Sequence, residues 1–309
     1  EVLLVIDRLV TLVGDQPFRT LLPIRYTTPK EILFVGTREW HAASQHLQGL
    51  VGQDANVRLT EMRDAYDPWD IRKQVTKKLR RLGWPIDSLV FDLSGGNRTM
   101  AFSLFGLARD HRRPLIDLEY IRRRHHLRLF VWEDGRYTQT RDERLPSLIT
   151  IEDYFRAHVP GIKVDGFSKD SRGRMDEGGH FEKCIHDTLA PHVDEILAGV
   201  RPAGVKDQIE IDMVVRCGNA VGIIEAKTGV KKAGIDQLDT AGNPHYLGEH
   251  ILKFLVTGRY LPQAHKALAF AQEIRVVELP GNHVRTGIPA QEERRLVDMV
   301  RSVLGDCAR

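Results

Sequence analysis

Residues 208–229 read QIEIDMVVRCGNAVGIIEAKTG, which predicts two adjacent strands joined by a tight turn. Asp212 lies on the first strand, and Glu225 and Lys227 lie at the end of the second. Because side chains alternate along a strand, Glu225 and Lys227 share one face. That face is apolar at Ile223 and becomes charged at the end of the strand. The change indicates a cleft at the end of a strand that otherwise belongs to the core.

Asp212, Glu225 and Lys227 are the side chains that metal-dependent phosphodiester hydrolysis requires. Two carboxylates on adjacent strands can bind Mg²⁺ or Mn²⁺, which prefer oxygen ligands. A lysine beside the metal supplies positive charge where the transition state gathers negative charge. Glu182, next to Phe181 on a predicted preceding helix, can add a third carboxylate. The alternative is an exposed cross-strand ion pair, which is common for charges at a strand end.

The segments around this pair of strands predict an α/β domain over residues 179–309. A helix is expected over residues 180–197, and a helical segment follows the strands near 233–247. The stretches ILKFLVTG, LPQAHKALAFAQ and IRVVELP then predict a strand, a helix and a strand, and a last helix begins at residue 290.

The N-terminal part predicts a second α/β domain over residues 1–160. Strand-length apolar runs alternate with helical segments, which is typical of a parallel sheet covered by helices. The runs are RLVTLVG, EILFVGT, NVRLTEM, SLVFDLSGG and PLIDLEYI. Residues 68–83 predict an amphipathic helix with a basic outer face, and Asp134-Gly135 predicts a hairpin within 127–140. The charged, glycine-rich stretch 161–178 is expected to be the linker.

One loop of the N-terminal domain has the composition of a phosphate-binding loop. In FDLSGGNRTMAFSLFGLA (91–108) a strand runs into Ser94-Gly95-Gly96-Asn97 and then a helix. Glycines let backbone amides approach a ligand, a helix N-terminus attracts phosphate, and Arg98 and Thr99 add a cation and a hydroxyl. Ligands in such sheets bind beyond the carboxyl ends of the strands, where the loop Gly14-Asp15-Gln16-Pro17 also lies. The alternative is that the glycine pair forms only a tight turn.

Composition restricts the class of protein but leaves its partner open. The 309 residues are 42% apolar and 28% charged, which indicates a folded protein with two domains. The net charge of +3 is too small to indicate a nucleic-acid binder. Cys184, Cys217 and Cys307 have no short spacing, so we expect neither a disulfide framework nor a thiolate zinc site, and a reducing cytoplasm fits. No segment reaches membrane-spanning length.

The C-terminal order of elements resembles the PD-(D/E)XK nuclease superfamily. The resemblance rests on a helix with Glu182, a strand with Asp212, a strand with Glu225-Ala226-Lys227, and a following helix and strand. It implies that Asp212, Glu225 and Lys227 take the motif positions and Glu182 that of the first-helix acid. Ile211 stands where the motif has proline.

The N-terminal motifs LVGDQP, EILFVGT and LSGGNRTM, with the hairpin and LITIEDYF, resemble the CARF domain. This Rossmann-like domain senses cyclic oligoadenylates in type III CRISPR immunity. The chain as a whole resembles the CRISPR ancillary nucleases over residues 8–165 and 175–280. Larger relatives carry a winged-helix module between the domains, for which the short linker leaves no room. The residues implied to bind the ligand are Gly14, Asp15, Gln16, Pro17, Thr37, Ser94, Gly95, Gly96, Asn97, Arg98 and Thr99.

The resemblance implies a cyclic-oligoadenylate-activated, metal-dependent endonuclease of antiviral defence. Its substrates would be single-stranded RNA, DNA or both, with nicking of duplex DNA in addition. It implies Mn²⁺ or Mg²⁺ at Asp212 and Glu225, cyclic tetra-adenylate as activator, and a cytoplasmic homodimer that binds one ring across its two-fold axis. Two alternatives are a ligand-independent restriction or repair nuclease and a non-catalytic sensor built on a degenerate nuclease fold.

Overall fold

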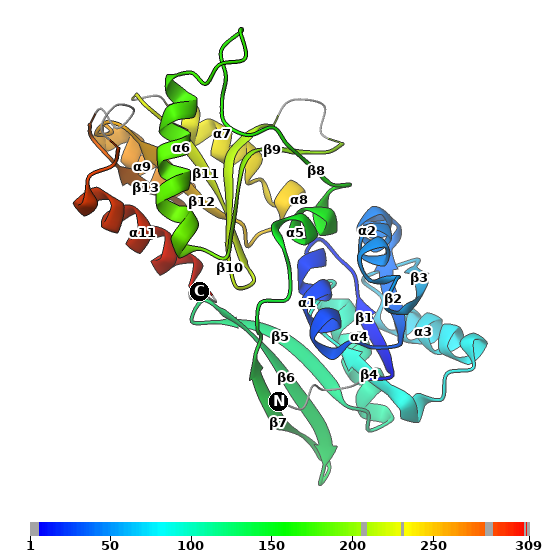
Figure 1. Cartoon of the computed structure of the whole chain (residues 1–309). Coiled ribbons are helices and arrows are strands. Elements are labelled where there is room, and N and C mark those ends of the chain that lie inside the picture. The colour runs from blue at the N-terminus through cyan, green and yellow to red at the C-terminus, as the bar shows by residue number, and fades with distance from the viewer. Residues whose placement is uncertain (1–5, 205–208, 230–231, 282–286, 306, 308–309) are drawn as a thin grey trace. The chain divides into compact units, whose positions relative to one another are not determined.

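Figure 1 shows the computed structural model of the chain, which describes residues 6–204, 209–229, 232–281, 287–305 and 307. The chain divides into two compact units. The first comprises the residues up to Leu148 together with Arg156–His158. The second comprises Ile149–Phe155 and the residues from Val159 onward. Each unit contains its own sheet. This confirms the predicted fold class, an α/β protein with two domains.

The first unit is built on a seven-stranded sheet in the order β3-β2-β1-β4-β5-β6-β7. Strands β1 to β5 are parallel, and β6 and β7 add an antiparallel hairpin, as the sequence predicts. The strands are β1 (Arg8–Leu12), β2 (Glu31–Thr37), β3 (Asn56–Met62), β4 (Leu89–Asp92), β5 (Leu115–Ile121), β6 (Arg124–Glu133) and β7 (Arg136–Arg144).

Helices cover both faces of this sheet. Because parallel crossovers are right-handed and the strand order reverses between β1 and β4, α1 and α2 lie on one face and α3 and α4 on the other. Leu12 and Leu33 share a hydrophobic core with α3 and α4. The predicted helix at 68–83 is confirmed as α3, which Asp67 caps and Gly83 ends with a φ of 66°. The helices are α1 (Pro17–Thr27), η1 (Arg38–Trp40), α2 (His41–Val51), α3 (Pro68–Leu82), η2 (Ile86–Ser88) and α4 (Arg98–Asp110).

The second unit is built on a six-stranded sheet in the order β13-β12-β11-β10-β9-β8. Strands β11, β12 and β13 are parallel, whereas β8, β9, β10 and β11 pair antiparallel. The strands are β8 (Ile162–Val164), β9 (Glu195–Pro202), β10 (Ile211–Cys217), β11 (Ala220–Lys227), β12 (Leu252–Thr257) and β13 (Ile274–Glu278).

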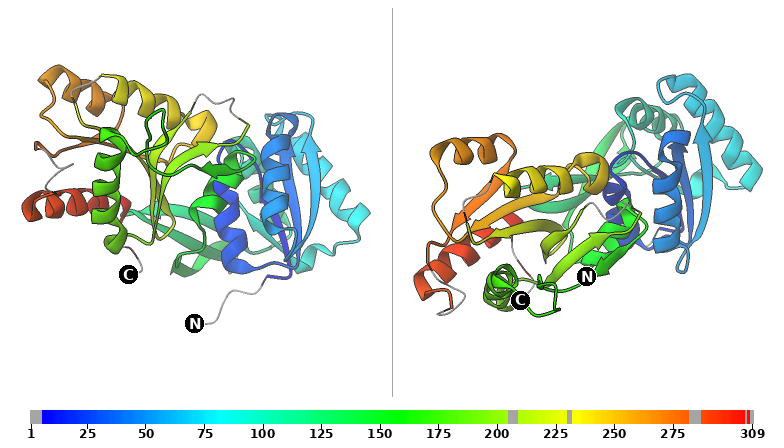
Figure 2. Two further views of the ribbon diagram at one scale, coloured as in Figure 1. Left: turned by 45° about the horizontal axis from the view of Figure 1, so that its top comes forward. Right: turned by 90° about the horizontal axis from the view of Figure 1, so that it is seen from above.

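Helices also cover both faces of the second sheet, as two further views show (Figure 2). Helices α6 and α11 pack on the face that carries Met213 and Ile224. Helix α7 packs on the other face, where Gly234 lies against Leu255. None of the described helices is long and apolar enough to cross a membrane. The helices are α5 (Ile151–His158), α6 (Glu177–Leu189), η3 (Ala190–His192), α7 (Ala233–Ala241), α8 (Pro244–Leu247), α9 (Gln263–Ala271) and α11 (Ala290–Leu304).

The predicted helix over 180–197 is too long. Helix α6 ends at Leu189, and β9 begins at Glu195. The sequence EILAGVRP is apolar enough for either a helix or a strand, so its periodicity does not decide between them. Antiparallel pairing with β10, with Val200 opposite Ile211, makes it a strand. The tertiary pairing therefore overrides the local pattern.

Residues 161–178, where the sequence suggests a linker, lie in the second unit. They contain β8, which pairs with β9. The backbone N–H groups of Asp165 and Gly166 donate to the carbonyls of Gly199 and Ala198. A glycine-rich, charged composition shows that few side chains enter a core, but backbone pairing does not depend on them. Its first residues, as β8, thus form the edge strand of the sheet.

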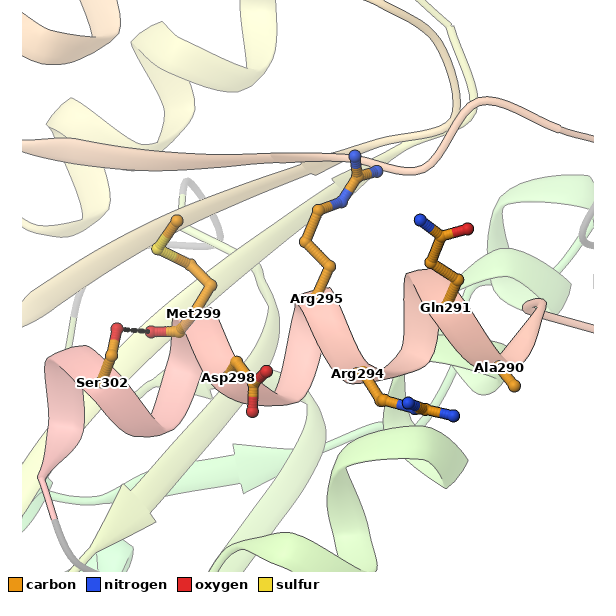
Figure 3. A pocket seen from close by; sticks show the side chains of 7 residues that line it. All are labelled: Ala290, Gln291, Arg294, Arg295, Asp298, Met299 and Ser302. Atoms are coloured by element: carbon orange, nitrogen blue, oxygen red, sulfur yellow. Dashed lines mark hydrogen bonds between the residues drawn. The ribbon is translucent and has the colours of Figure 1, made fainter.

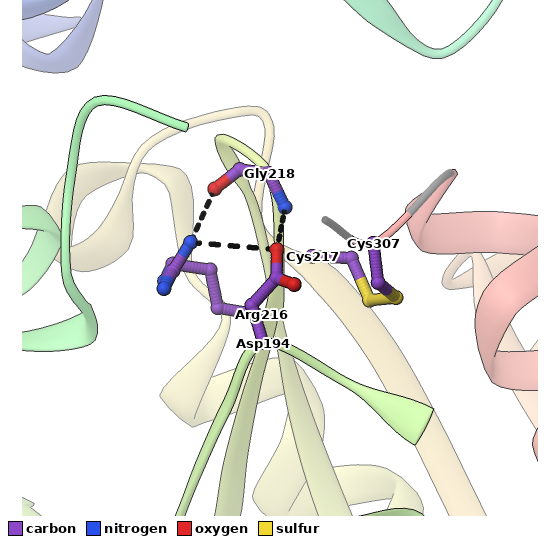
Figure 4. The surroundings of a disulfide bond; sticks show 5 residues. All are labelled: Asp194, Arg216, Cys217, Gly218 and Cys307. Carbon is purple, nitrogen blue, oxygen red and sulfur yellow. Dashed lines mark hydrogen bonds and ion pairs between the residues drawn. A yellow bond between two sulfur atoms is a disulfide. The ribbon is translucent and has the colours of Figure 1, made fainter. Parts of the chain in front are cut away.

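Two of the three cysteines, Cys217 and Cys307, form a disulfide, although the sequence supports no disulfide framework (Figure 4). A disulfide joins Cys217, at the end of β10, to Cys307, which follows α11. The partners are 90 residues apart, so no spacing rule predicts the pair. Beside it, Arg216 donates to the Gly218 carbonyl at 2.6 Å, and the Gly218 N–H donates to Asp194 at 2.6 Å. Disulfides persist in oxidising compartments, so the cysteines no longer support a reducing one.

Candidate functional site

The register of the β10–β11 hairpin brings Asp212 opposite Glu225. Met213 pairs with Ile224, and the next step of the same ladder places Asp212 beside Glu225. The backbone N–H of Ala226 donates to Oδ2 of Asp212 at 2.8 Å, which fixes this carboxylate against β11. Two carboxylates from adjacent strands therefore meet at one place on the sheet.

Lys227 lies between these two carboxylates. Its Nζ is 3.8 Å from Asp212 Oδ2 and forms a closer ion pair with Glu225 Oε1. All three side chains are largely buried, with exposed fractions of 13% for Asp212, 3% for Glu225 and 22% for Lys227. This cluster is not the exposed ion pair that charges at a strand end commonly form.

Burial and mutual repulsion perturb the pKa values of this cluster. The pKa of Glu225 is raised to about 8, first by burial and then by the charge of Asp212, with Lys227 opposing both. The pKa of Asp212 is raised to about 6 by burial, against the charge of Lys227. Burial lowers the pKa of Lys227, but the charges of Asp212 and Glu225 outweigh it and raise the pKa overall. The charge of Lys227 therefore does not fully offset the cost of ionising both buried carboxylates.

These donors fit a hard divalent cation. Glu225 Oε1 is buried, and the ammonium of Lys227 faces it in an ion pair. Carboxylate oxygens are the ligands that Mg²⁺ and Mn²⁺ prefer. In the part of the chain that the structure describes, no group of three or more His, Cys, Asp or Glu side chains could hold a metal. Asp212 and Glu225 would therefore supply two ligands, and the remaining ligands would be waters or backbone carbonyls.

Glu182 lies within electrostatic reach of this pair, but its oxygens are already engaged. Its charge contributes to raising the pKa values of Asp212 and Glu225. The Ser168 N–H donates to its Oε2 at 3.0 Å, and the Ser168 hydroxyl donates to its Oε1 at 2.7 Å. Glu182 is 4% exposed. Ser168, which no sequence pattern marks, therefore positions the helix acid.

Helix α7 covers the cluster closely because residue 234 is glycine. A Cβ at Gly234 would lie 3.2 Å from Cγ of Lys227, 3.6 Å from Cγ of Glu225 and 3.0 Å from Cδ1 of Leu255. Glycine within a helix costs about 1 kcal/mol relative to alanine. A glycine in the first turn of the helix that follows the Glu-x-Lys strand is the sequence signal that could have predicted this close packing of α7 on the cluster.

A hollow of about 640 Å³ opens in the first unit, at the carboxyl ends of β1 to β4. The strand order reverses here, where ligands of open α/β sheets bind. Of the residues implied to bind the ligand, those that line the hollow are Gly14, Asp15, Thr37, Gly96, Asn97 and Arg98. Those that do not line it are Gln16, Pro17, Ser94, Gly95 and Thr99.

The loops after β2 and β3 supply lining residues that the sequence reasoning missed. They add two aromatic rings, Trp40 and Tyr66, and two cations, Arg38 and Arg63. Rings can stack on bases and guanidinium groups can bind phosphates, so this lining suits a nucleotide. The available signal was a pair of Arg and aromatic clusters directly after predicted strands. The full set of added residues is Arg38, Glu39, Trp40, Met62, Arg63, Asp64, Ala65, Tyr66 and Met100.

Ser94 supports the glycine loop from inside the unit. Its N–H and hydroxyl both donate to Asp92, which also accepts a hydrogen bond from the Thr11 hydroxyl at 2.6 Å. Ser94 Oγ in turn accepts the Leu118 N–H at 2.8 Å. Burial raises the pKa of Asp92 to about 6, against these hydrogen bonds. The network ties the loop to β1 and β5.

Gly95→Ala is expected to lower the melting temperature by about 3–10 °C. A Cβ there would lie 2.3 Å from the Leu12 carbonyl oxygen and 2.8 Å from Thr20 Oγ1, so the backbone must shift, at about 1–3 kcal/mol. Thermal denaturation measures the change. Gly49→Ala is the control, because Gly49 has no neighbour within 4 Å of that position. An equal loss in both variants would contradict the steric explanation.

Comparisons with known proteins give structural matches alone. No protein-family model matches the chain, and no curated protein matches its sequence. Protein VC1899 from Vibrio cholerae matches with a TM-score of 0.75 and 15% identity, over 97% of this chain and 99% of its own. Can2 from Sulfobacillus thermosulfidooxidans, in complex with cyclic tetra-adenylate, matches with a TM-score of 0.73 and 14% identity, over 96% and 99%.

A third structure is a type III CRISPR defence DNA nuclease activated by cyclic oligoadenylate. It matches 94% of this chain with a TM-score of 0.61 and 15% identity, and 51% of its own length is covered. At such identities the matches establish the fold. Over nearly its whole length, this chain has the two-domain α/β fold of VC1899 and Can2, and its structure is similar to that of this type III CRISPR defence DNA nuclease.

Proposed function

We propose that this chain is a metal-dependent endonuclease activated by a cyclic oligoadenylate. Its substrates would be single-stranded RNA or DNA, with nicking of duplex DNA in addition. The observation that carries the proposal is the buried cluster of Asp212, Glu225 and Lys227 at the ends of paired strands. The shared fold with Can2, which was solved with cyclic tetra-adenylate, supports the activation part.

Each residue of the cluster has a distinct role in the proposed reaction. Asp212 and Glu225 would hold Mn²⁺ or Mg²⁺, which supplies Lewis acidity to the scissile phosphate. Lys227 keeps its proton, because its pKa is raised, and so places a fixed positive charge where the transition state becomes more negative. The charge of Glu182 adds to the negative charge around Asp212 and Glu225, and Ser168 holds the Glu182 carboxylate in place. The sheet fixes these positions before the substrate binds.

The hollow of the first unit is the proposed activator site. Helix α4 begins at Arg98, so its N-terminal N–H groups and the Gly95-Gly96 loop favour phosphate binding. Arg38, Arg63 and Arg98 add cations, and the two aromatic rings suit adenine bases. A cyclic, symmetric ligand suits a two-fold interface, so we propose that two copies of the chain bind one ring between them.

We place the protein in the cytoplasm, because the proposed activator and substrates are cytoplasmic molecules.

Cleavage of labelled single-stranded RNA and DNA, with and without Mn²⁺ and cyclic tetra-adenylate, tests the proposal. We expect cleavage only when both are present. Arg98→Ala is expected to raise the activator concentration required by about tenfold or more, because a hydrogen bond to a charged group contributes about 1.5–3 kcal/mol. Arg58→Ala is the control, since Arg58 is exposed on β3 and outside the hollow.

Two other outcomes would replace this function. Cleavage that is indifferent to the ligand would indicate a restriction or repair nuclease, with a steep salt dependence of duplex binding. Binding of the ligand without any cleavage would indicate a non-catalytic sensor. A thermal-shift series with cyclic tri-, tetra- and hexa-adenylate would identify the ring size, because a ligand that binds only the folded state raises its melting temperature.

A further inference from the structure

Helix α3 carries a continuous basic stripe on its outer face. The inner face is buried through Ile71, Val75 and Leu79. The outer face lines a hollow of about 650 Å³ that runs along the helix. The residues of this α3 stripe are Trp69, Arg72, Lys73, Thr76, Lys77, Arg80 and Arg81. They are spaced three and four residues apart, so they lie along one side of the helix, and none of them is acidic.

Most cations of the α3 stripe have no carboxylate partner. Arg72 pairs with Asp110. The others, Lys73, Lys77, Arg80 and Arg81, are exposed and form no ion pair with any described residue.

Helix stability does not explain these charges. Cations in the last turn, such as Arg80 and Arg81, interact favourably with the helix dipole. Lys73 and Lys77 lie further from the C-terminus, and like charges four residues apart destabilise a helix. Lys73, Lys77 and Arg81 form such a series, so a role outside folding accounts for it better.

An exposed indole lies at the beginning of the stripe. Trp69 is 75% exposed, and the guanidinium of Arg72 lies 5.5 Å from the centre of its ring. The cation holds the ring in place and leaves most of its surface open. Proteins that bind single-stranded nucleic acid combine a row of cations for the phosphates with aromatic rings on which bases stack.

Helix α11 in the second unit provides a comparison, because it also has 15 residues and lines a surface hollow. That hollow has a volume of about 800 Å³ (Figure 3). Arg294 and Arg295 extend to different sides of the helix, and Asp298 lies on the next turn. No aromatic residue lines it among the residues described. This mixed lining is that of an ordinary solvated helix, so the uniform charge of the α3 stripe is not a general property of helical surfaces in this chain.

We propose that the α3 stripe binds single-stranded nucleic acid, through its phosphates at the cations and through one base at Trp69. The inference rests on the proposed nuclease function, because it makes the substrate polymer the occupant.

Fluorescence anisotropy with labelled oligo-uridylate and oligo-thymidylate, in EDTA and without activator, tests this proposal. In the combined variant Lys73→Gln, Lys77→Gln and Arg81→Gln we expect affinity to fall at least about tenfold at low salt, and the slope of log affinity against log salt to fall by about 2, since each phosphate contact on a single strand contributes roughly 0.7. Trp69→Ala is expected to weaken binding about tenfold with little change in the slope. Arg294→Gln with Arg295→Gln is the matched control and should bind like the parent.

Unchanged affinity and slope in the combined variant would overturn the proposal. So would a loss of self-association that accounts for the weaker binding, because the stripe would then contact a second copy of the chain; size-exclusion chromatography separates these cases. The substituted side chains are exposed, so the melting temperature should not fall. Binding is measured without cleavage, so a chain that binds through the stripe but never cleaves would refute the proposed nuclease and leave this inference standing.

Discussion

Glu225→Gln is expected to reduce metal-dependent cleavage at least about a thousandfold. Glutamine preserves the shape of the side chain but removes the charge that a divalent cation needs, and Glu225 supplies one of only two proposed carboxylate ligands. Lys227→Met should reduce cleavage about 100-fold to 1,000-fold, because it removes positive charge from a preorganised site. Initial rates at saturating Mn²⁺ and activator measure both effects.

The control for this prediction is Asp236→Asn on α7. Asp236 is exposed, and its side chain forms a 3.7 Å surface ion pair with Lys232. We expect its rate to be within about twofold of the parent, as surface pairs contribute little. Activator binding, measured by thermal shift, should be the same in all of these proteins, which separates loss of chemistry from loss of activation. Full activity in both Glu225→Gln and Lys227→Met would place the chemistry elsewhere in the chain.

A titration with Mn²⁺ distinguishes the loss of a metal ligand from the loss of a positive charge that acts in the transition state. If Glu225 binds the metal, calorimetry should show Mn²⁺ binding to the parent and much weaker binding to Glu225→Gln. Lys227→Met should retain Mn²⁺ binding, because it removes a competing cation from the same carboxylates. Loss of cleavage with intact metal binding in Lys227→Met is therefore the expected signature of a residue that acts in the transition state.

The proximity of Asp212 and Glu225 could be predicted because local rules fix it. A two-strand unit with a short turn has one register that keeps its apolar residues on the buried faces, and a shift by one residue would turn them outward. Once Met213 pairs with Ile224, the two acids must be neighbours. The same reasoning explains why the parallel sheet and α3 could be predicted, since each has a strong hydrophobic period and clear end signals.

Contacts between distant segments could not be predicted in this way. Ser168 reaches Glu182 across a stretch whose composition indicates a linker, and Cys307 reaches Cys217 over 90 residues. Nothing in either local sequence specifies these partners. The aromatic and cationic lining of the first-unit hollow could not be predicted for the same reason, because it comes from four separate loops that meet only after the sheet has formed. The predicted glycine loop contributes backbone and support, whereas other loops contribute most of the side chains.

In the absence of a divalent metal, the stability of the second unit is expected to fall as pH rises through the titration of Glu225. Folding raises the pKa of this carboxyl from 4.5 to about 8. Between these values the folded state holds a proton that the unfolded state has released, so each rise in pH favours unfolding, by up to about 1.4 kcal/mol per pH unit for one group. The stabilising proton is fully bound below the unfolded pKa and is lost as pH passes the folded value.

Glu225→Gln isolates this contribution, because glutamine cannot ionise and keeps the neutral shape at every pH. The variant should melt close to the parent near pH 5 and several degrees above it near pH 8, in EDTA. Added Mn²⁺ should reverse the order at the higher pH, since it binds the ionised parent and stabilises its folded state. Asp236→Asn should follow the parent throughout. A parent that gains stability relative to Glu225→Gln as pH rises without metal would show that Glu225 is ionised at no cost in the folded protein. The repulsion between Asp212 and Glu225 would then give no reason for the site to bind a cation.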